Sequence, residues 1–255
     1  MRIGIDGRGI RPEPDGIGRY TRQLIRAAAG AFPDAEIVVW CLPSAREFLP
    51  RFQQIRPLIC NRHHLSRFTV HRFARHVEKS GVDLFHSPFF LAPVGIRCPV
   101  LVTVHDLMAL EMPDFFDDSF RLVAQYKRRF HQRYVVKSLR AANRVLAVSR
   151  WVAKRVEALG VSRENLRVLP NAVDPQFTST PPGSDHENLR SLGLQPGYFL
   201  HVGRWKRYKN LPVLLEDYQH YVARTRREPV VLVLCRGGGT DRRVETALDQ
   251  LRLRD

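Results

Sequence analysis

The sequence is short of acidic residues relative to basic ones. It holds 41 lysines and arginines against 25 aspartates and glutamates, a formal net charge of +16 at pH 7. Two long stretches, 48–77 and 120–156, contain no acid at all. Such an excess of positive charge indicates an anionic partner, which can be nucleic acid, an anionic membrane surface or a phosphorylated substrate. Charge alone does not choose among these three.

Long apolar runs and close pairs of cysteines are missing too. No window approaches the ~20 apolar residues that span a bilayer, and MRIGIDGRGI at the start lacks the apolar stretch of a signal peptide. The cysteines at 41, 60, 98 and 235 form no CxxC, and each lies in or beside an apolar run. We therefore expect buried free thiols and a cytoplasmic protein, whose membrane contact, at the inner face of the cytoplasmic membrane, is at most peripheral.

Two standard nucleotide-binding motifs are also absent. A dinucleotide site needs GxGxxG directly after a strand, and the nearest match, which includes Gly16 and Gly18, comes about ten residues late and lacks the third glycine. Neither GxxxxGKS nor GxxxxGKT occurs, which argues against P-loop chemistry. Gly16 and Gly18 nevertheless lie at the entrance to an expected helix, where backbone N–H groups favour phosphate. A flexible loop with ordinary turn glycines is the alternative.

Apolar runs of strand length alternate with longer amphipathic stretches. We expect strands at 2–5, 36–42, 82–86, 99–105, 144–148 and 166–169, and helices at 17–30, about 119–141 and 150–159. Ser149 is placed to cap the helix at 150–159, and Gly160 to end it. This alternation predicts an α/β fold with a parallel sheet that carries helices on both faces.

Residues 173–197 interrupt the pattern with proline, glycine, serine and threonine, so we interpret them as an interdomain linker. The alternation resumes with strands at 198–203 and 230–235 and helices at about 211–226 and from about 242. The predicted organisation is a first domain at 1–172, the linker at 173–197 and the start of a second domain at 198–255. Because so few elements leave apolar faces and strand edges open, we expect this second domain to be incomplete.

The segment GRWKRYKN links an expected strand to an expected helix. The strand ends at Gly203, and Asn210 is expected to cap the helix, with Pro212 in its first turn. A helix start at the carboxyl end of a parallel strand favours an anion. Arg204 adds a planar bidentate donor and Lys209 a point charge, so the loop is predicted to bind phosphate groups. A solvated basic loop is the alternative.

The segment TVHDL places two polar residues at the carboxyl end of an apolar strand. His105 can hydrogen-bond a sugar hydroxyl, and Asp106 can accept a hydrogen bond or stabilise a positive centre. His86 and Ser87 end another strand in the same way, with a weaker signal. A purely structural histidine is the alternative at position 105.

The expected helix at about 119–141 is strongly basic. Its cations are Arg121, Lys127, Arg128, Arg129, Arg133 and Lys137, interleaved with Phe120, Val123, Tyr126, Phe130 and Tyr134. Basic helices with exposed aromatics bind anionic membranes, where each cation contributes ~1 kcal/mol. The alternative is a solvated face above a core stripe. Nucleic acid is the weaker partner, because no recognition-helix, zinc or aromatic-sheet motif accompanies the charge.

Four segments occur in the order seen in the family 4 retaining glycosyltransferases, which have the GT-B fold. The chain resembles that family in MRIGIDGRGI with DGIGRYTRQL, in CPVLVTVHDL, in RVLAVSRWVAKRVEALGVSRENLRVLPNAVD and in YFLHVGRWKRYKNLPVLLE. Family members have two Rossmann-like domains with parallel sheets. The nucleotide sugar binds mainly to the C-terminal domain and the acceptor to the N-terminal one. The resemblance therefore implies a GT-B chain whose second domain is incomplete.

The resemblance implies roles for the matching residues. Arg204 and Lys209 would stabilise the donor diphosphate as the nucleotide leaves. Gly203 and Asn210 flank that pair and belong to the same donor site. The family needs no metal ion or other cofactor and uses no protein nucleophile, since retention is explained by front-face attack of the acceptor hydroxyl.

Further donor contacts follow from the other segments. Gly16 and Gly18 would lie near the phosphate and the transferred sugar. His105 would contact the sugar, Asp106 would shape its site, and Asn171 would lie at the hinge side of the cleft.

The family's late acidic motif, two glutamates about eight positions apart, falls beyond this chain, since Glu245 and Asp249 come too early. The resemblance thus implies little activity for these residues alone. It favours mannose from GDP-mannose, ahead of UDP-sugars, transferred to a saccharide or polyprenyl-diphosphate-linked acceptor in surface polysaccharide or lipopolysaccharide synthesis. Three alternatives stay open: a non-catalytic partner protein, a basic nucleic-acid-binding protein and a nucleotide-sugar epimerase of the same fold.

Overall fold

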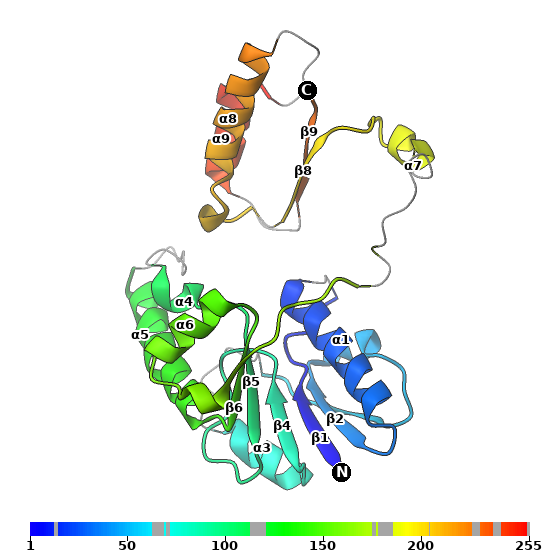
Figure 1. Cartoon of the computed structure of the whole chain (residues 1–255), viewed down its shortest axis with the longest axis vertical. Coiled ribbons are helices and arrows are strands. Elements are labelled where there is room, and N and C mark those ends of the chain that lie inside the picture. The colour runs from blue at the N-terminus through cyan, green and yellow to red at the C-terminus, as the bar shows by residue number, and fades with distance from the viewer. Residues whose placement is uncertain are drawn as a thin grey trace. The chain divides into compact units, whose positions relative to one another are not determined.

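The computed structural model describes residues 1–12, 15–62, 69, 72–112, 121–174, 177, 186–203, 205–225, 230–236 and 241–253. The chain divides into two compact units, Met1–Ala172 and Val173–Asp255 (Figure 1). Each unit contains a parallel sheet, so each is described by itself.

The first unit is built on a parallel sheet in the order β3-β2-β1-β4-β5-β6-β7. Its strands are β1 Arg2–Asp6, β2 Glu36–Cys41, β3 Ile55–Ile59, β4 Leu84–Ser87, β5 Val100–Val104, β6 Arg144–Ala147 and β7 Leu166–Val168. The chain runs outward from β1 to β3 on one side and then returns to β4 on the other. This reversal creates a switch point, where open α/β sheets bind ligands beyond the carboxyl ends of their strands.

Helices cover both faces of this sheet (Figure 1). They are α1 Gly16–Ala31, η1 Pro43–Phe48, α3 Phe73–Ser80, α4 Met108–Glu111, α5 Arg121–Ala141, α6 Arg150–Ala158 and η2 Arg163–Asn165. Alternate residues of β2 belong to two different cores, with Val38 and Trp40 in one and Ile37, Val39 and Cys41 in the other. This period of two is the pattern expected of a strand buried on both faces.

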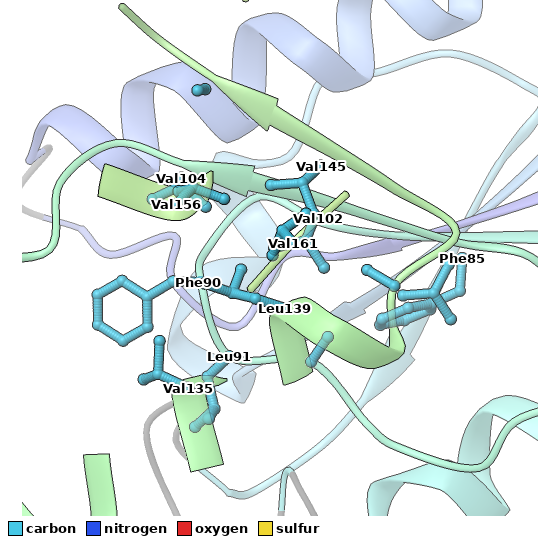
Figure 2. Close-up of a cluster of buried hydrophobic side chains, with 14 of the residues drawn as sticks. Phe85, Phe90, Leu91, Val102, Val104, Val135, Leu139, Val145, Val156 and Val161 are labelled. Atoms are coloured by element: carbon cyan, nitrogen blue, oxygen red, sulfur yellow. The ribbon is translucent and has the colours of Figure 1, made fainter. Parts of the chain in front are cut away.

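The larger core lies between the sheet and α3, α5 and α6. Val102 and Val145 of neighbouring strands pack with Leu139 of α5 and Val156 of α6 (Figure 2). The smaller core lies under α1, which buries Ile25 between the strands and η1. The predicted parallel sheet with helices on both faces is confirmed.

Local sequence signals set the ends of two helices. Asp15 caps α1, because its carboxylate accepts a hydrogen bond from the Gly18 amide at 2.8 Å. Ser149 caps α6 by accepting from the Val152 amide at 3.2 Å, as predicted. Gly160 follows that helix with a φ of 87°, a left-handed conformation that favours glycine.

The sequence patterns did not predict strand β3 and helix α3. Both lie in or beside the acid-poor stretch 48–77. Pro57 lies within β3 and weakens the strand signal, but β3 is the edge strand of the sheet, where proline is tolerated.

The expectation that all four thiols are buried is wrong for Cys235. Cys41 and Cys60 are buried and Cys98 is partly buried, whereas Cys235 is exposed. Leu232 and Leu234 of the same strand pack on the core of the second unit, and Cys235 alternates to the opposite face. Burial raises the pKa of the Cys41 thiol to about 11, consistent with an unreactive structural role.

The described part of the second unit is built on two strands and a pair of helices that pack together, with two further short helices. Its elements are α7 His186–Ser191, β8 Phe199–Gly203, η3 Arg207–Lys209, α8 Leu211–Arg224, β9 Leu232–Arg236 and α9 Arg242–Gln250. Its core holds Trp205, Leu211, Leu215, Val244 and Leu248. The other sheet face is open, with Leu200 54% and Val202 69% exposed, as expected from so few elements.

Candidate functional site

His105 follows strand β5 at the carboxyl edge of the first sheet. Its Nε2 lies 3.2 Å from the carbonyl oxygen of Pro88, which follows β4. A carbonyl oxygen can only accept, so Nε2 carries the proton and Nδ1 is left as an acceptor in the neutral ring. Burial lowers the pKa of His105, although the Pro88 carbonyl and the charge of Asp106 partly oppose this. Near neutral pH the imidazole therefore offers Nδ1 to a hydroxyl donor.

Asp106 shapes the backbone directly after His105. Its Oδ1 accepts a hydrogen bond from the Met108 amide at 3.1 Å, at the start of the short helix α4. This bond fixes the turn that follows β5. Its predicted role in shaping a sugar site stays a prediction.

Gly16 and Gly18, at the start of α1, differ in their surroundings. A Cβ added at Gly16 would meet nothing within 4 Å, so this position is open to a ligand. A Cβ at Gly18 would meet Asp15 Oδ1 at 3.2 Å and the Gly9 carbonyl oxygen at 3.4 Å. The Gly18 amide already donates to Asp15, so that N–H is occupied and a carboxylate lies beside it. The contact of either glycine with phosphate stays a prediction.

Strands β4 and β5 carry polar side chains that the sequence patterns did not connect. Thr103 is 1% exposed, and its hydroxyl lies 2.8 Å from His86 Nε2 and 3.2 Å from the Tyr20 hydroxyl. Tyr20 also contacts His105 edge-on, with ring centroids 4.6 Å apart. The sequence pattern marked Tyr20 only as an apolar position of α1. The sequence signal that could have revealed this contact is the presence of two polar residues, His86 and Thr103, within apolar strands.

His86 and Ser87 are both buried. His86 is 5% exposed, and burial, with a smaller effect of His105, lowers its pKa to about 3. Ser87 donates its hydroxyl toward the carbonyl oxygens of Phe89 and Leu91, which shapes the loop after β4.

A buried ion pair underlies the loop after β1. Arg8 is fully buried, and its guanidinium donates to both carboxylate oxygens of Asp6 at 2.8 and 2.6 Å. It also lies 3.7 Å above the Phe73 ring of α3 and donates to the Arg62 carbonyl oxygen at 3.5 Å. Burial alone would lower the pKa of Arg8, but the charge and hydrogen bonds of Asp6, with Cys60, raise it. The sequence patterns did not single out this pair, which ties the loop to α3 and to the segment after β3.

The phosphate loop predicted in the second unit follows strand β8. Gly203 ends the strand, Lys209 is exposed in η3, and Arg204 lies outside the described residues. Lys209 Nζ lies 5.6 Å from the centroid of the Tyr208 ring. The order of strand, basic turn and helix α8 matches the sequence prediction.

Asn210 does not cap α8 in the predicted way. It has a φ of 51° and a ψ of 37°, and its side chain makes no capping hydrogen bond with any residue described. A cap residue normally has an extended backbone that turns its side chain toward the first helical amides, and the left-handed conformation prevents this. Pro212 lies in the first turn as expected. The amides at this helix start are therefore not occupied by the Asn210 side chain.

The predicted residues fall into two sets. Gly16, Gly18, His105 and Asp106 belong to the first unit, where the Tyr20–His105 contact brings the start of α1 to the end of β5. Gly203, Lys209 and Asn210 belong to the second unit. Asn171 is exposed after β7 at the end of the first unit.

The basic face of α5 is partly as predicted. Exposed side chains include Lys127, Arg128, Arg129, Arg133 and Lys137, while the side chain of Arg121 and residue Phe120 lie outside the described part. The expectation of exposed aromatics is wrong for Phe130, which packs in the core at 8% exposure because it faces the sheet. Tyr126 is 51% exposed. Across the described ranges, no helix has the length and apolar character needed to cross a membrane.

Among the described residues, no three histidine, cysteine, aspartate or glutamate side chains gather where they could hold a metal ion. Metal independence remains a prediction.

Comparison with known proteins gives the same family as the motifs. The model of Glycosyltransferase Family 4 matches residues 14–177. No curated protein sequence matches the chain. The match spans most of the first unit and more than half of the sequence.

Solved structures share the fold at low identity. HepE from Anabaena, solved with UDP and glucose, is 16% identical with a TM-score of 0.65 over 100% of this chain and 67% of its own. Sucrose-phosphate synthase from Thermosynechococcus elongatus is 16% identical with a TM-score of 0.66 over 100% of this chain and 69% of its own. UDP-GlcNAc 2-epimerase from Methanocaldococcus jannaschii is 12% identical, with a TM-score of 0.50 over 99% of this chain and 69% of its own.

The chain thus spans about two thirds of the structures that it resembles. The two parallel sheets, and the strand order of the first one, fit the fold that the matched family model implies. The chain belongs to glycosyltransferase family 4 and has the GT-B fold.

Proposed function

We propose that this protein transfers a hexose, with mannose favoured, from a nucleoside-diphosphate sugar to a saccharide or polyprenyl-diphosphate-linked acceptor, with retention of configuration. The observation that carries the proposal is the turn from Gly203 to α8. It places exposed Lys209 directly before a helix start that the Asn210 side chain leaves uncapped. A cation beside a helix start suits the donor diphosphate, because helix N-termini and charge-assisted hydrogen bonds both favour anions. GDP-mannose is the first donor to test, with UDP-glucose, which HepE binds, as the second.

The chemistry needs stabilisation of a leaving group more than a nucleophile. The bond between the sugar C1 and the diphosphate oxygen breaks, and negative charge develops on the departing nucleotide. Lys209, with Arg204, and the amides of α8 would stabilise that charge. The acceptor hydroxyl attacks from the same face, and its proton passes to the departing phosphate oxygen. No metal ion or other cofactor is part of this proposal.

His105 would act on the sugar rather than on the phosphate. Its Nε2 proton is committed to the Pro88 carbonyl, so the ring presents Nδ1, an acceptor. An acceptor suits a sugar hydroxyl and not a phosphate oxygen. Gly16, where a side chain would meet open space, leaves room for the sugar beside it.

The acceptor and the location follow from the charge of α5. Its exposed cations would hold the protein at the inner, anionic face of the cytoplasmic membrane, where polyprenyl-linked saccharides are extended in surface polysaccharide or lipopolysaccharide synthesis. The domain boundaries at 172 and 197 are part of the same proposal, with the donor carried by the second domain.

A thermal-shift panel tests the donor class. We expect GDP-mannose, or failing that UDP-glucose, to raise the melting temperature of the protein, and excess RNA to leave that shift in place. Tight RNA binding that resists nucleoside diphosphates would instead indicate a nucleic-acid-binding protein.

Two further outcomes distinguish a transferase from a non-catalytic partner protein and from an epimerase. A folded chain stabilised by no nucleotide sugar contradicts the proposal and favours a non-catalytic partner. The fold also occurs in an epimerase, so products must be analysed with donor alone. A converted nucleotide sugar without acceptor would indicate an epimerase.

A further inference from the structure

A buried hydroxyl connects three elements beneath the proposed sugar site. Thr103 of β5 lies between His86 of β4 and Tyr20 of α1, within hydrogen-bonding distance of both. His86 and Thr103 are almost completely buried, while Tyr20 is half-buried. Buried polar atoms are costly to leave unpaired, so this arrangement fixes the Tyr20 hydroxyl in one place.

His105 makes two contacts that restrict its ring. The Pro88 carbonyl engages Nε2, and the Tyr20 ring meets the imidazole at an interplanar angle of 82°. One contact comes from the loop after β4 and the other from the first turns of α1. Tyr20 lies four positions beyond Gly16 in α1, so its contact with His105 connects the start of that helix to the histidine.

We propose that Tyr20, anchored by the Thr103 hydroxyl, is a positioning residue that sets the orientation of the His105 imidazole relative to the start of α1. It touches no reacting atom and acts through His105. The anchor is electrically neutral, because His86 is buried in its uncharged form. It therefore orients the ring without adding charge near the sugar. The inference rests on the proposed function only where it assigns a sugar hydroxyl to His105.

Direct observation of the His105 ring separates positioning from general packing. Two-bond correlation spectra of protein with 15N-labelled histidine report the tautomer and pKa of each imidazole, and His105→Gln assigns the His105 signals. In the wild-type protein we expect the Nε2–H tautomer and a pKa below the ordinary value.

Tyr20→Leu removes the ring and its anchor. We expect a mixed tautomer and a His105 pKa that rises toward its ordinary value, because water reaches the imidazole. Tyr20→Phe keeps the ring and should give a smaller change. Phe32→Leu, which removes an exposed ring at the other end of α1, is the matched control and should leave the His105 signals unchanged.

Thr103 provides a second pair of variants. Thr103→Val removes the hydroxyl and should shift the His105 signals in the same direction as Tyr20→Phe, while Thr103→Ser keeps the hydroxyl and should resemble the wild-type protein. Melting curves establish that each variant is folded. Unchanged His105 signals in both Tyr20→Leu and Thr103→Val would overturn the proposal.

Ligand binding provides a second, independent test of the positioning role of Tyr20. If His105 contacts the sugar, Tyr20→Leu should reduce the affinity for GDP-mannose by about fivefold and leave the affinity for GDP unchanged. Equal losses for both ligands would count against positioning through the sugar. Altered His105 signals in a protein that binds no nucleotide sugar would support positioning and overturn the proposed function, so the two failures are distinguishable.

Discussion

At the scale of single residues, the buried polar groups of the first unit have the clearest consequences for its stability. Arg8 and Asp6 form an ion pair with side chains 0% and 3% exposed, which also stacks on Phe73. Arg2 and Glu36 form a pair of similar length at the surface. Breaking a buried pair strands a charge in a medium of low polarity, whereas a surface pair is replaced by water.

Arg8→Ala should therefore lower the free energy of unfolding by about 3–5 kcal/mol, because the buried Asp6 carboxylate loses the guanidinium that balances its charge. Urea denaturation followed by circular dichroism measures the change. Arg56→Ala, which removes a surface partner of Glu36, is the control and should alter stability little. A small effect of Arg8→Ala would mean that Asp6 reaches water.

The buried histidines should make the protein sensitive to acid. His86 has a pKa of about 3 when folded, below the ~6.5 of an exposed histidine. The unfolded chain therefore binds more protons between these values, and stability falls as the pH drops from about 6.5 toward about 3.

From His86 alone the loss approaches the limit for one proton, roughly 1 kcal/mol per pH unit. His86→Gln, which keeps a hydrogen-bonding side chain, should flatten the pH dependence of the melting temperature. Parallel curves for the two proteins would contradict the assignment. His131, whose pKa burial lowers to about 4, is present in both proteins and contributes to both curves.

At the scale of elements, local signals were predictable and contacts between distant segments were not. Asp15 and Ser149 cap helices through residues three positions away, so sequence spacing is enough to find such caps. The Tyr20–Thr103 contact depends on α1 meeting β5, which no spacing reveals. Asparagine is a common capping residue, but the backbone of Asn210 lies in the left-handed region, which is the wrong conformation for a cap.

Stability measurements can distinguish the start of α6, which Ser149 caps, from the start of α8, which has no side-chain cap from Asn210. Ser149→Ala should destabilise the protein by about 1 kcal/mol, since the Val152 amide loses its acceptor. Asn210→Gly should be neutral or slightly stabilising, because glycine tolerates a φ of 51° and no side-chain cap is lost. Thermal melts of both variants check the pair. An Asn210→Gly protein as unstable as Ser149→Ala would show that Asn210 does cap α8.

At the scale of the whole molecule, composition predicted an anionic partner without naming it. The sequence motifs predicted the family and the fold, and both are confirmed. Composition did not reveal how the charge is distributed among the described residues, where several exposed cations share α5.

Binding to vesicles tests the role of that charge. The double variant Arg129→Glu and Arg133→Glu should bind anionic phosphatidylglycerol vesicles more weakly by at least about tenfold, since each cation contributes ~1 kcal/mol. Arg19→Glu with Arg26→Glu makes the same change in net charge on α1 and is the control. Equal losses in both double variants would show that total charge, and not the α5 surface, governs binding.

Calorimetric titration of GDP shows whether the segment GRWKRYKN holds the donor diphosphate. Lys209→Ala should weaken GDP binding by about tenfold or more, the value of one charge-assisted hydrogen bond. Lys206→Ala removes an exposed cation from the same loop and should leave the affinity nearly unchanged. If Lys209→Ala binds GDP as tightly as the wild-type protein, or if both variants lose affinity equally, this loop does not bind the donor as proposed.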